Sequence, residues 1–401
     1  MPPPTLIERK VSWRLTTSLF VIGVIVLVMI ALVVRGSLSR STPRTAPPLA
    51  ATSARLGPAD LLVETHRVVL PAEYVGVRDW TVPRRWVLHG YDRARATELL
   101  RDVSGAAESL QCDPNGCTLW PTSAALLALS PESRTRLYSV LAEMRENPQA
   151  DDAFHRTAAE GPFSTVTDLP PGAARWVDAF TWDVNGVHCF SDISSVCSRL
   201  QDHDACNAFV RTMLSRRSAT IRLRLRSPGV IERAVAEFVP ERQAEVRETL
   251  TAAIARGETT FMLSVFMPAW ARARLRTFPT PDEDWTNCFW TALNFVNRAP
   301  GVIGNYAELE AVLGTDFDRV TGPTRFGDIM VLRASRNRPI HAATVLVAGY
   351  VFTKNGFGHL QAWRIVPTTQ VTADFPATTS IDYWRVRSAA AVATTRAARH
   401  T

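Results

Sequence analysis

The stretch that decides the fold is DWTNCFWTALNF, residues 284–295, together with HAATVLVAGYVF, residues 341–352. The first stretch places Cys288 at the start of a predicted helix, and the second places His341 at the start of a predicted strand hairpin. A thiol at a helix N-terminus is a better nucleophile than a free thiol, because the helix dipole favours the thiolate and a nearby imidazole can take the proton. We therefore predict that the two stretches meet in space and form a Cys288–His341 pair.

The residues around these two stretches predict a small α+β domain over 276–387, in which the cysteine helix packs on a small antiparallel sheet. The expected elements are helices at 287–297 and 305–313, a turn at Gly327-Asp328 leading into a strand that ends at Leu332, a hairpin of 341–347 with 350–352, and a strand at 362–366. Residues 388–401 hold mostly Ala, Thr and Arg and are predicted to be a disordered tail.

A helix opened by a cysteine, a Gly-Asp before a strand, and a histidine opening an apolar strand resemble the NlpC-type cysteine peptidases. These are papain-like cell-wall hydrolases, and the related CHAP amidases share the order. The resemblance covers only the last domain and implies that Cys288 is the nucleophile and His341 the general base. It also places Gly327-Asp328 before the second strand, where we expect Asp328 to have a structural role. Phe289-Trp290 departs from the pattern, since small residues usually follow the cysteine.

The third catalytic residue that the resemblance implies is polar and lies about a dozen residues after the histidine. This region reads Thr353-Lys354-Asn355, so all three residues are candidates. An asparagine can orient the imidazole through its amide oxygen, whereas a charged lysine cannot accept the imidazole hydrogen bond. Asn355 is therefore the first choice.

The expected reaction is attack by the Cys288 thiolate on an amide carbonyl, with His341 acting first as base and then as acid. The main-chain amide of Cys288 could help to hold the oxyanion. The resemblance implies that the amide lies in a peptidoglycan peptide. Other interpretations stay open: a transglutaminase-like or acyltransferase thiol enzyme, or a catalytically inactive envelope scaffold or binding protein in which Cys288 is a buried apolar residue.

The N-terminal region predicts a membrane anchor. Residues 15–34 form an uncharged, mostly aliphatic run of the length that a bilayer core requires. Arg35-Gly36 follows directly, without the small-residue cleavage site of a signal peptide. We therefore expect a cytoplasmic segment at 1–14, an uncleaved single-pass anchor in the cytoplasmic membrane, a flexible linker at 35–58, and the remaining domains outside the membrane, on the periplasmic side.

The upstream domain, residues 59–275, is predicted to be mixed α/β or mostly helical. Residues 130–147 are expected to form a helix capped by Ser130, and 228–256 a helix broken near Pro240. Residues 219–225 alternate strictly between apolar and polar side chains, which indicates a half-buried strand. No motif gives this domain a function.

Five cysteines besides Cys288 lie in the upstream domain. Cys112 and Cys117 flank a tight turn and can approach to disulfide distance, which an extracytoplasmic location would permit. In the second cluster two of three cysteines could pair, or the cluster could hold zinc with two nearby histidines; its members are His188, Cys189, Cys197, His203 and Cys206. The spacing fits no familiar zinc pattern, so disulfides are the preferred interpretation and no metal or cofactor is expected.

The net charge of +7 comes almost wholly from arginine, because Lys10 and Lys354 are the only lysines. The basic residues are scattered and form no stripe with aromatic residues, so the sequence does not favour nucleic acid as a partner. The expected partners are the membrane, through the anchor, and a peptide or peptidoglycan substrate.

Overall fold

The fold was examined in a computed structural model. It describes residues 55–387, with gaps at 77–78, 145, 152, 158–160, 201, 284, 299–300, 302, 304 and 357. The predicted anchor at 15–34 and the predicted tail at 388–401 lie outside the described residues. Within the described residues, no helix is long and apolar enough to cross a membrane.

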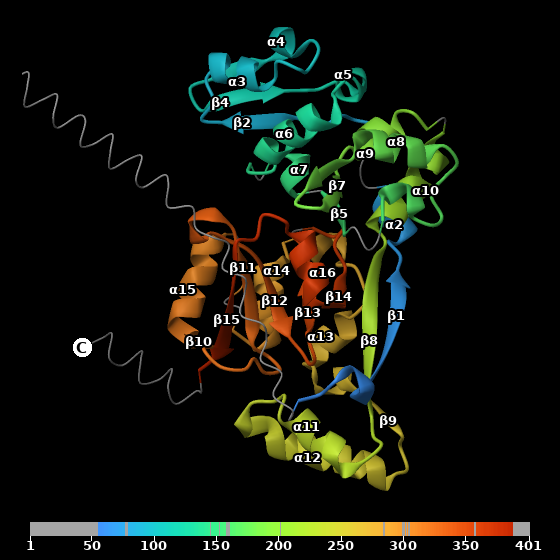
Figure 1. Ribbon diagram of the computed structural model, residues 1–401, viewed down its shortest axis with the longest axis vertical. Coiled ribbons are helices and arrows are strands. Elements are labelled where there is room, and N and C mark those ends of the chain that lie inside the picture. Colours follow the sequence, from blue (N-terminus) through green and yellow to red (C-terminus); the bar gives the residue numbers. More distant parts are fainter. Residues whose placement is uncertain are drawn as a thin grey trace, which may run out of the picture. The chain divides into compact units, whose positions relative to one another are not determined.

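The last part of the chain forms a six-stranded antiparallel sheet in the order β10-β15-β11-β12-β13-β14 (Figure 1). Its strands are β10 (Phe317–Arg319), β11 (Ile329–Arg333), β12 (Pro339–Val345), β13 (Tyr350–Lys354), β14 (Trp363–Pro367) and β15 (Ser380–Val386). The helices around it are α13 (Ala269–Arg274), α14 (Cys288–Phe295), α15 (Tyr306–Asp316) and α16 (Thr368–Asp374).

Side-chain alternation along the strands divides this core between two faces of the sheet. On one face Val331 and Ala342 pack with Cys288 and the rest of α14. On the other face Leu332 and Ala343 pack with Val371 of α16. Strand β12 therefore presents successive side chains to two different helices.

A second antiparallel sheet, β1-β8-β9, is built from two long strands, β1 and β8, and the short strand β9. Its elements are β1 (Leu61–Val68), β8 (Arg216–Arg224), β9 (Thr260–Met262) and the helices α11 (Pro228–Val235) and α12 (Pro240–Ala255). Strand β8 also lies beside β14, where the amide of Ile365 donates to the hydroxyl of Ser218 at 3.0 Å. This contact joins the second sheet to the last part of the chain.

The remaining upstream residues form two three-stranded sheets, β2-β4-β3 and β5-β7-β6, with short helices around them. The strands are β2 (Trp86–His89), β3 (Gln111–Asp113), β4 (Gly116–Leu119), β5 (Phe154–Thr157), β6 (Trp182–Val184) and β7 (Val187–Phe190). The helices are α2 (Ala72–Val75), α3 (Arg93–Leu99), α4 (Ala106–Ser109), α5 (Ser123–Leu127), α6 (Pro131–Leu141), α7 (Pro148–Asp151), α8 (Ala173–Phe180), α9 (Ile193–Cys197) and α10 (His203–Leu214).

Two disulfides form in this region, Cys112–Cys117 across the β3–β4 hairpin and Cys197–Cys206 between α9 and α10. Cys189 and Cys288 are free and buried. The expected pairing of Cys112 with Cys117 is confirmed. The alternative of zinc in the second cluster is wrong, because two of its thiols are bonded to each other.

The mixed α+β architecture and its antiparallel sheets are confirmed. The predicted hairpin is present as β12 and β13, although β12 begins two residues earlier, at Pro339. The predicted helix at 130–147 is shorter and ends at Leu141, but Ser130 caps it by accepting from the amide of Ser133.

Candidate functional site

The thiol of Cys288 sits in the first turn of α14. Asn287 caps this helix, because its side-chain oxygen accepts from the amide of Trp290 at 2.8 Å. The Asn287 side chain is fully buried, and its amide nitrogen donates to the carbonyl of Ile303. The start of α14 is thus held from both sides, and the position of the thiol with it.

Opposing influences act on the pKa of Cys288. Burial raises it, and this is the largest influence. The main-chain N–H groups of Ala342, Phe289 and Gly356 and the ammonium of Lys354 act in the other direction, because each stabilises a thiolate. The pKa stays above the ordinary value, so the resting form near neutral pH is the thiol. These N–H groups and the ammonium surround the place where negative charge would develop.

Lys354 is fully buried at the end of β13. Its ammonium donates to the carbonyls of Thr286, Gly356 and Gly358, at 2.8, 3.2 and 2.9 Å. The carbonyl of Thr286 lies just before α14, whereas the other two lie in the loop after β13. Lys354 therefore ties this loop to the start of the cysteine helix.

His341 is fully buried near the start of β12. Its Nε2 lies 2.8 Å from Oγ1 of Thr353, and its ring stacks on Phe375 with 4.2 Å between centroids. Its Nδ1 is buried and has no hydrogen-bond partner among the described residues. Burial lowers the pKa of His341 to about 3, so the ring is neutral near neutral pH.

The structure brings Cys288 to the start of β12 but forms no hydrogen bond between Cys288 and His341 in the described part of the chain. The thiol instead lies at the main-chain N–H of Ala342, the residue that follows His341. When Nε2 carries the proton and donates to Thr353, Nδ1 is left with a lone pair that can accept one. The predicted pair is not formed in this conformation, because Cys288 packs on the face of the sheet that carries Ala342, whereas the side chain of His341 lies on the opposite face with Thr353 and Phe375.

Thr353, and not Asn355, contacts the imidazole. Thr353 lies inside β13 and points to the same face of the sheet as His341, whereas Asn355 follows the end of the strand. The side-chain amide of Asn355 donates to Asp374 at 2.7 Å. The first choice for the third residue therefore changes from Asn355 to Thr353. A transglutaminase-like enzyme would be expected to place an aspartate against this imidazole. Among the described residues, no aspartate contacts it.

Asp328 holds a turn, as expected from the sequence. Its carboxylate accepts from the guanidinium of Arg385 at 2.7 and 2.8 Å and from the amide of Arg325 at 2.7 Å. Gly327 has φ +92°, a conformation that L side chains rarely adopt. The Gly-Asp pair thus fixes the entry into β11 and has no described contact with the thiol.

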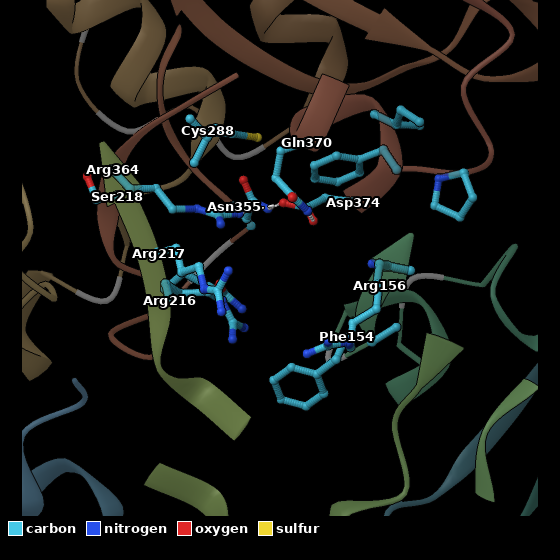
Figure 2. A pocket seen from close by; sticks show the side chains of 18 of the residues that line it. Phe154, Arg156, Arg216, Arg217, Ser218, Cys288, Asn355, Arg364, Gln370 and Asp374 are labelled. Atoms are coloured by element: carbon cyan, nitrogen blue, oxygen red, sulfur yellow. Dashed lines mark hydrogen bonds and ion pairs between the residues drawn. The ribbon is translucent and has the colours of Figure 1, made fainter. Parts of the chain in front are cut away.

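A cavity of about 1080 Å³ opens beside Cys288. Figure 2 shows Cys288 and Asn355 on one side of it and Arg216 on the other, at the start of β8. Arg364 and Asp374 complete this wall and form a buried ion pair. The cavity is therefore lined both by the last part of the chain and by the strand that joins it to the upstream region.

Arg216, Arg364 and Asp374 were not anticipated from the sequence. Arg216 lies three residues before the strand predicted at 219–225, whose alternation indicates only a half-buried strand. Only the packing of β8 against β14 brings Arg216 and Arg364 together, and the two are far apart in the chain. The sequence could therefore indicate this group of residues only if the contact between β8 and β14 were already known.

Within the described ranges, no group of three or more His, Cys, Asp or Glu side chains is placed to hold a metal ion. No protein-family model, no curated protein and no solved structure matches this chain. The chemistry of the site therefore rests on the residues described above.

Proposed function

We propose that this protein is a thiol hydrolase that cleaves an amide bond with Cys288 as nucleophile and His341 as base, in a papain-like domain of the NlpC type. One observation carries the proposal. The Cys288 thiol lies in the first turn of α14, at the main-chain N–H groups of Ala342, Phe289 and Gly356 and near the Lys354 ammonium, and each of these groups would stabilise a thiolate. The imidazole of His341 lies on the other face of the sheet, where Nε2 contacts Thr353 and Nδ1 has no partner among the described residues, so its role as base requires it to turn to the face of α14.

The reaction begins from a neutral thiol and a neutral imidazole. Once the imidazole has turned to the face of α14, Nδ1 of His341 takes the thiol proton while sulfur bonds to the amide carbon, and the carbonyl oxygen becomes an oxyanion. The main-chain N–H groups of Phe289 and Gly356 and the ammonium of Lys354 stabilise negative charge on the sulfur as the proton leaves, and the main-chain amide of Cys288 is the proposed donor to the oxyanion. The proton then passes to the leaving nitrogen, and water hydrolyses the thioester that remains on Cys288.

The substrate class that we propose is a peptidoglycan peptide, and it follows from the resemblance to NlpC-type peptidases. The proposed location is outside the cytoplasmic membrane, with the chain anchored by residues 15–34. Two disulfides support an oxidising compartment.

The test is release of new amino groups from purified cell-wall peptides by the detergent-solubilised full chain. We expect release to stop in Cys288→Ser, because a hydroxyl is far less nucleophilic than a thiolate, and in His341→Gln. Cys189→Ser is the matched control, since Cys189 is the other free, buried thiol. Equal release by wild type and Cys288→Ser would rule out the proposed nucleophile.

A second candidate is a binding protein that keeps the papain-like domain without its chemistry. The observation in its favour is that neither partner is charged at rest, since burial raises the pKa of Cys288 and lowers that of His341 to about 3. Tight binding of a wall peptide, with no release of amino groups over hours and no acyl-enzyme by mass spectrometry, would favour this candidate.

A further inference from the structure

The lining of the cavity beside Cys288 carries more positive than negative charge. It includes six arginines and two carboxylates, the latter from Glu143 and Asp374. At the inner wall Arg364 pairs with Asp374, and both side chains are almost completely buried. A buried charge without a counter-ion is unfavourable, so any excess here favours an anionic ligand.

Arg216 supplies the excess positive charge. Its Nη1 donates to the carbonyls of Met213 and Ser215, at 2.7 and 3.3 Å, and its guanidinium lies over the ring of Phe154. Its Nε and Nη2 have no hydrogen-bond partner among the described residues. Burial, and next the charge of Arg364, lower the pKa of Arg216 to about 10, so it is still charged near neutral pH.

The one nearby carboxylate is already occupied. Asp374 accepts from Arg364, from Asn355 at 2.7 Å and from Gln370 at 2.9 Å. The neighbouring His155 adds no charge near neutral pH, because burial lowers its pKa to about 4. The buried guanidinium of Arg364 therefore takes this carboxylate, and the half-buried guanidinium of Arg216 lies near it without an ion pair of its own among the described residues.

This cluster is connected to the thiol through a short segment. Asn355 bonds to Asp374, and the next residue, Gly356, directs its N–H at Cys288. Figure 2 shows Arg216 and Arg217 close to each other, with Arg364 extending toward Asn355 and Asp374. A molecule in the cavity could thus touch the arginines at one end and Cys288 at the other.

We infer that the cavity binds a peptide carboxylate at Arg216, beside Arg364, so that the substrates of Cys288 are acidic peptides. The statement about substrates rests on the proposed function, whereas binding of a carboxylate at this site does not require catalysis. The free Nε and Nη2 edge of Arg216 matches the two oxygens of a carboxylate. One uncompensated positive charge calls for one negative charge, and Asp374 would repel a dianionic phosphate.

The test is calorimetry on the full chain in detergent, carrying Cys288→Ala so that no probe is cleaved. Two pairs of probes differ only in one charge: N-acetyl-Ala-Ala and its C-terminal amide, and N-acetyl-Ala-Glu-amide and N-acetyl-Ala-Gln-amide. Inorganic phosphate is the third type of probe. We expect the acid of at least one pair to bind at least tenfold more tightly than its neutral partner.

In Arg216→Gln the preference for the acid should fall below threefold. The matched control is Arg222→Gln, which removes the same charge from the same strand at a position paired with Glu64 and outside the cavity lining. It should keep the full preference. If Arg216→Gln fails to fold, the comparison of acid and amide in the Cys288→Ala chain still decides the inference.

Equal binding of acid and neutral probe in both pairs, no binding of any probe, or a preference that survives Arg216→Gln would overturn the inference. Tighter binding of phosphate than of either acid would overturn the assignment to a peptide carboxylate. The two proposals fail separately. Cys288-dependent cleavage that ignores peptide charge removes only this inference, whereas a strong preference for the acid without any cleavage removes only the hydrolase.

Discussion

Nε2 of His341 lies 2.8 Å from Oγ1 of Thr353, across two neighbouring strands of the sheet. The backbone pairing of β12 with β13 joins Thr344 to Phe352 and Val345 to Val351, so this contact lies beyond the last paired residues. Here the two strands are held by side chains and not by the backbone ladder. The hydroxyl of Thr353 therefore determines which way the imidazole faces, and this can be tested.

Thr353→Val should lower the rate of peptide cleavage at least tenfold while the protein still folds. Valine keeps the shape of threonine but leaves Nε2 of His341 buried without a partner, so the ring is free to adopt other orientations and tautomers. Thr353→Ser restores a hydroxyl and should recover most of the rate. The readout is kcat against KM, since a purely structural role would not be rescued selectively in kcat. Unchanged kcat in Thr353→Val would contradict the orienting role.

Lys354→Met should destabilise the domain and make the thiol less reactive. Three carbonyls lose a charged donor, that of Thr286 in a buried bond and those of Gly356 and Gly358 in partly buried ones, and a buried, unpaired carbonyl costs about 1–3 kcal/mol, so we expect a loss of at least about 1 kcal/mol of unfolding free energy. The pKa of Cys288 should also rise further, because the ammonium lowers it in the wild type. Denaturant unfolding and iodoacetamide alkylation at pH 9 measure the two effects.

The control for this variant is Arg256→Met, at an exposed position, which should change stability by less than about 0.5 kcal/mol. Faster alkylation of Cys288 in Lys354→Met than in wild type would show that the ammonium does not stabilise the thiolate.

The elements around the thiol could be predicted because their signals are local. The apolar run from Ala342 to Phe352 is long enough, and broken sharply enough at Ala348-Gly349, to indicate a hairpin without any knowledge of its neighbours. Strand β15 was missed, because its residues are mostly half-buried and its partner β11 lies far upstream. The same limit applies to Arg216, whose neighbour Arg364 is brought close only by the pairing of two distant segments.

The choice of the third residue illustrates a finer limit. Thr353, Lys354 and Asn355 all follow the histidine at a suitable distance in the chain, and side-chain chemistry alone favours the amide of Asn355. The strand continues to Lys354, however, so alternation directs Thr353 toward His341 and Lys354 to the opposite face, that of α14. The predicted strand ends at Phe352, two residues before the observed end at Lys354, and this difference is enough to reverse the assignment.

The half-buried His155 should make the protein sensitive to acid. Its pKa is about 4 in the folded state and near 6.5 when unfolded, so the unfolded state binds the proton more readily between these values. The stability that neutral His155 contributes is complete above pH 6.5 and is lost as the pH falls through 4. In His155→Gln this loss is absent. The free energy of unfolding of the wild type should therefore fall by up to about 3 kcal/mol relative to that of the variant over this pH range.

Urea unfolding of both proteins at pH 7, 5.5 and 4.5 measures this difference. Asp192, whose pKa burial raises to about 7, acts in the opposite sense but is common to both proteins and cancels in the comparison. Parallel pH dependence in wild type and variant would mean that His155 is solvated or already charged in the folded protein.

The disulfide between Cys197 and Cys206 should stabilise the upstream region more than the one between Cys112 and Cys117. The first closes a loop with a sequence separation of 9 and the second one of 5, and a longer loop restricts the unfolded chain more strongly. Replacing both cysteines of a pair by alanine should cost about 2.6 kcal/mol for the first pair and about 2.1 kcal/mol for the second. In unfolded, unreduced protein, iodoacetamide should label only the two free thiols, those of Cys189 and Cys288. Labelling of Cys197 or Cys206 in protein purified from an oxidising compartment would contradict this pairing.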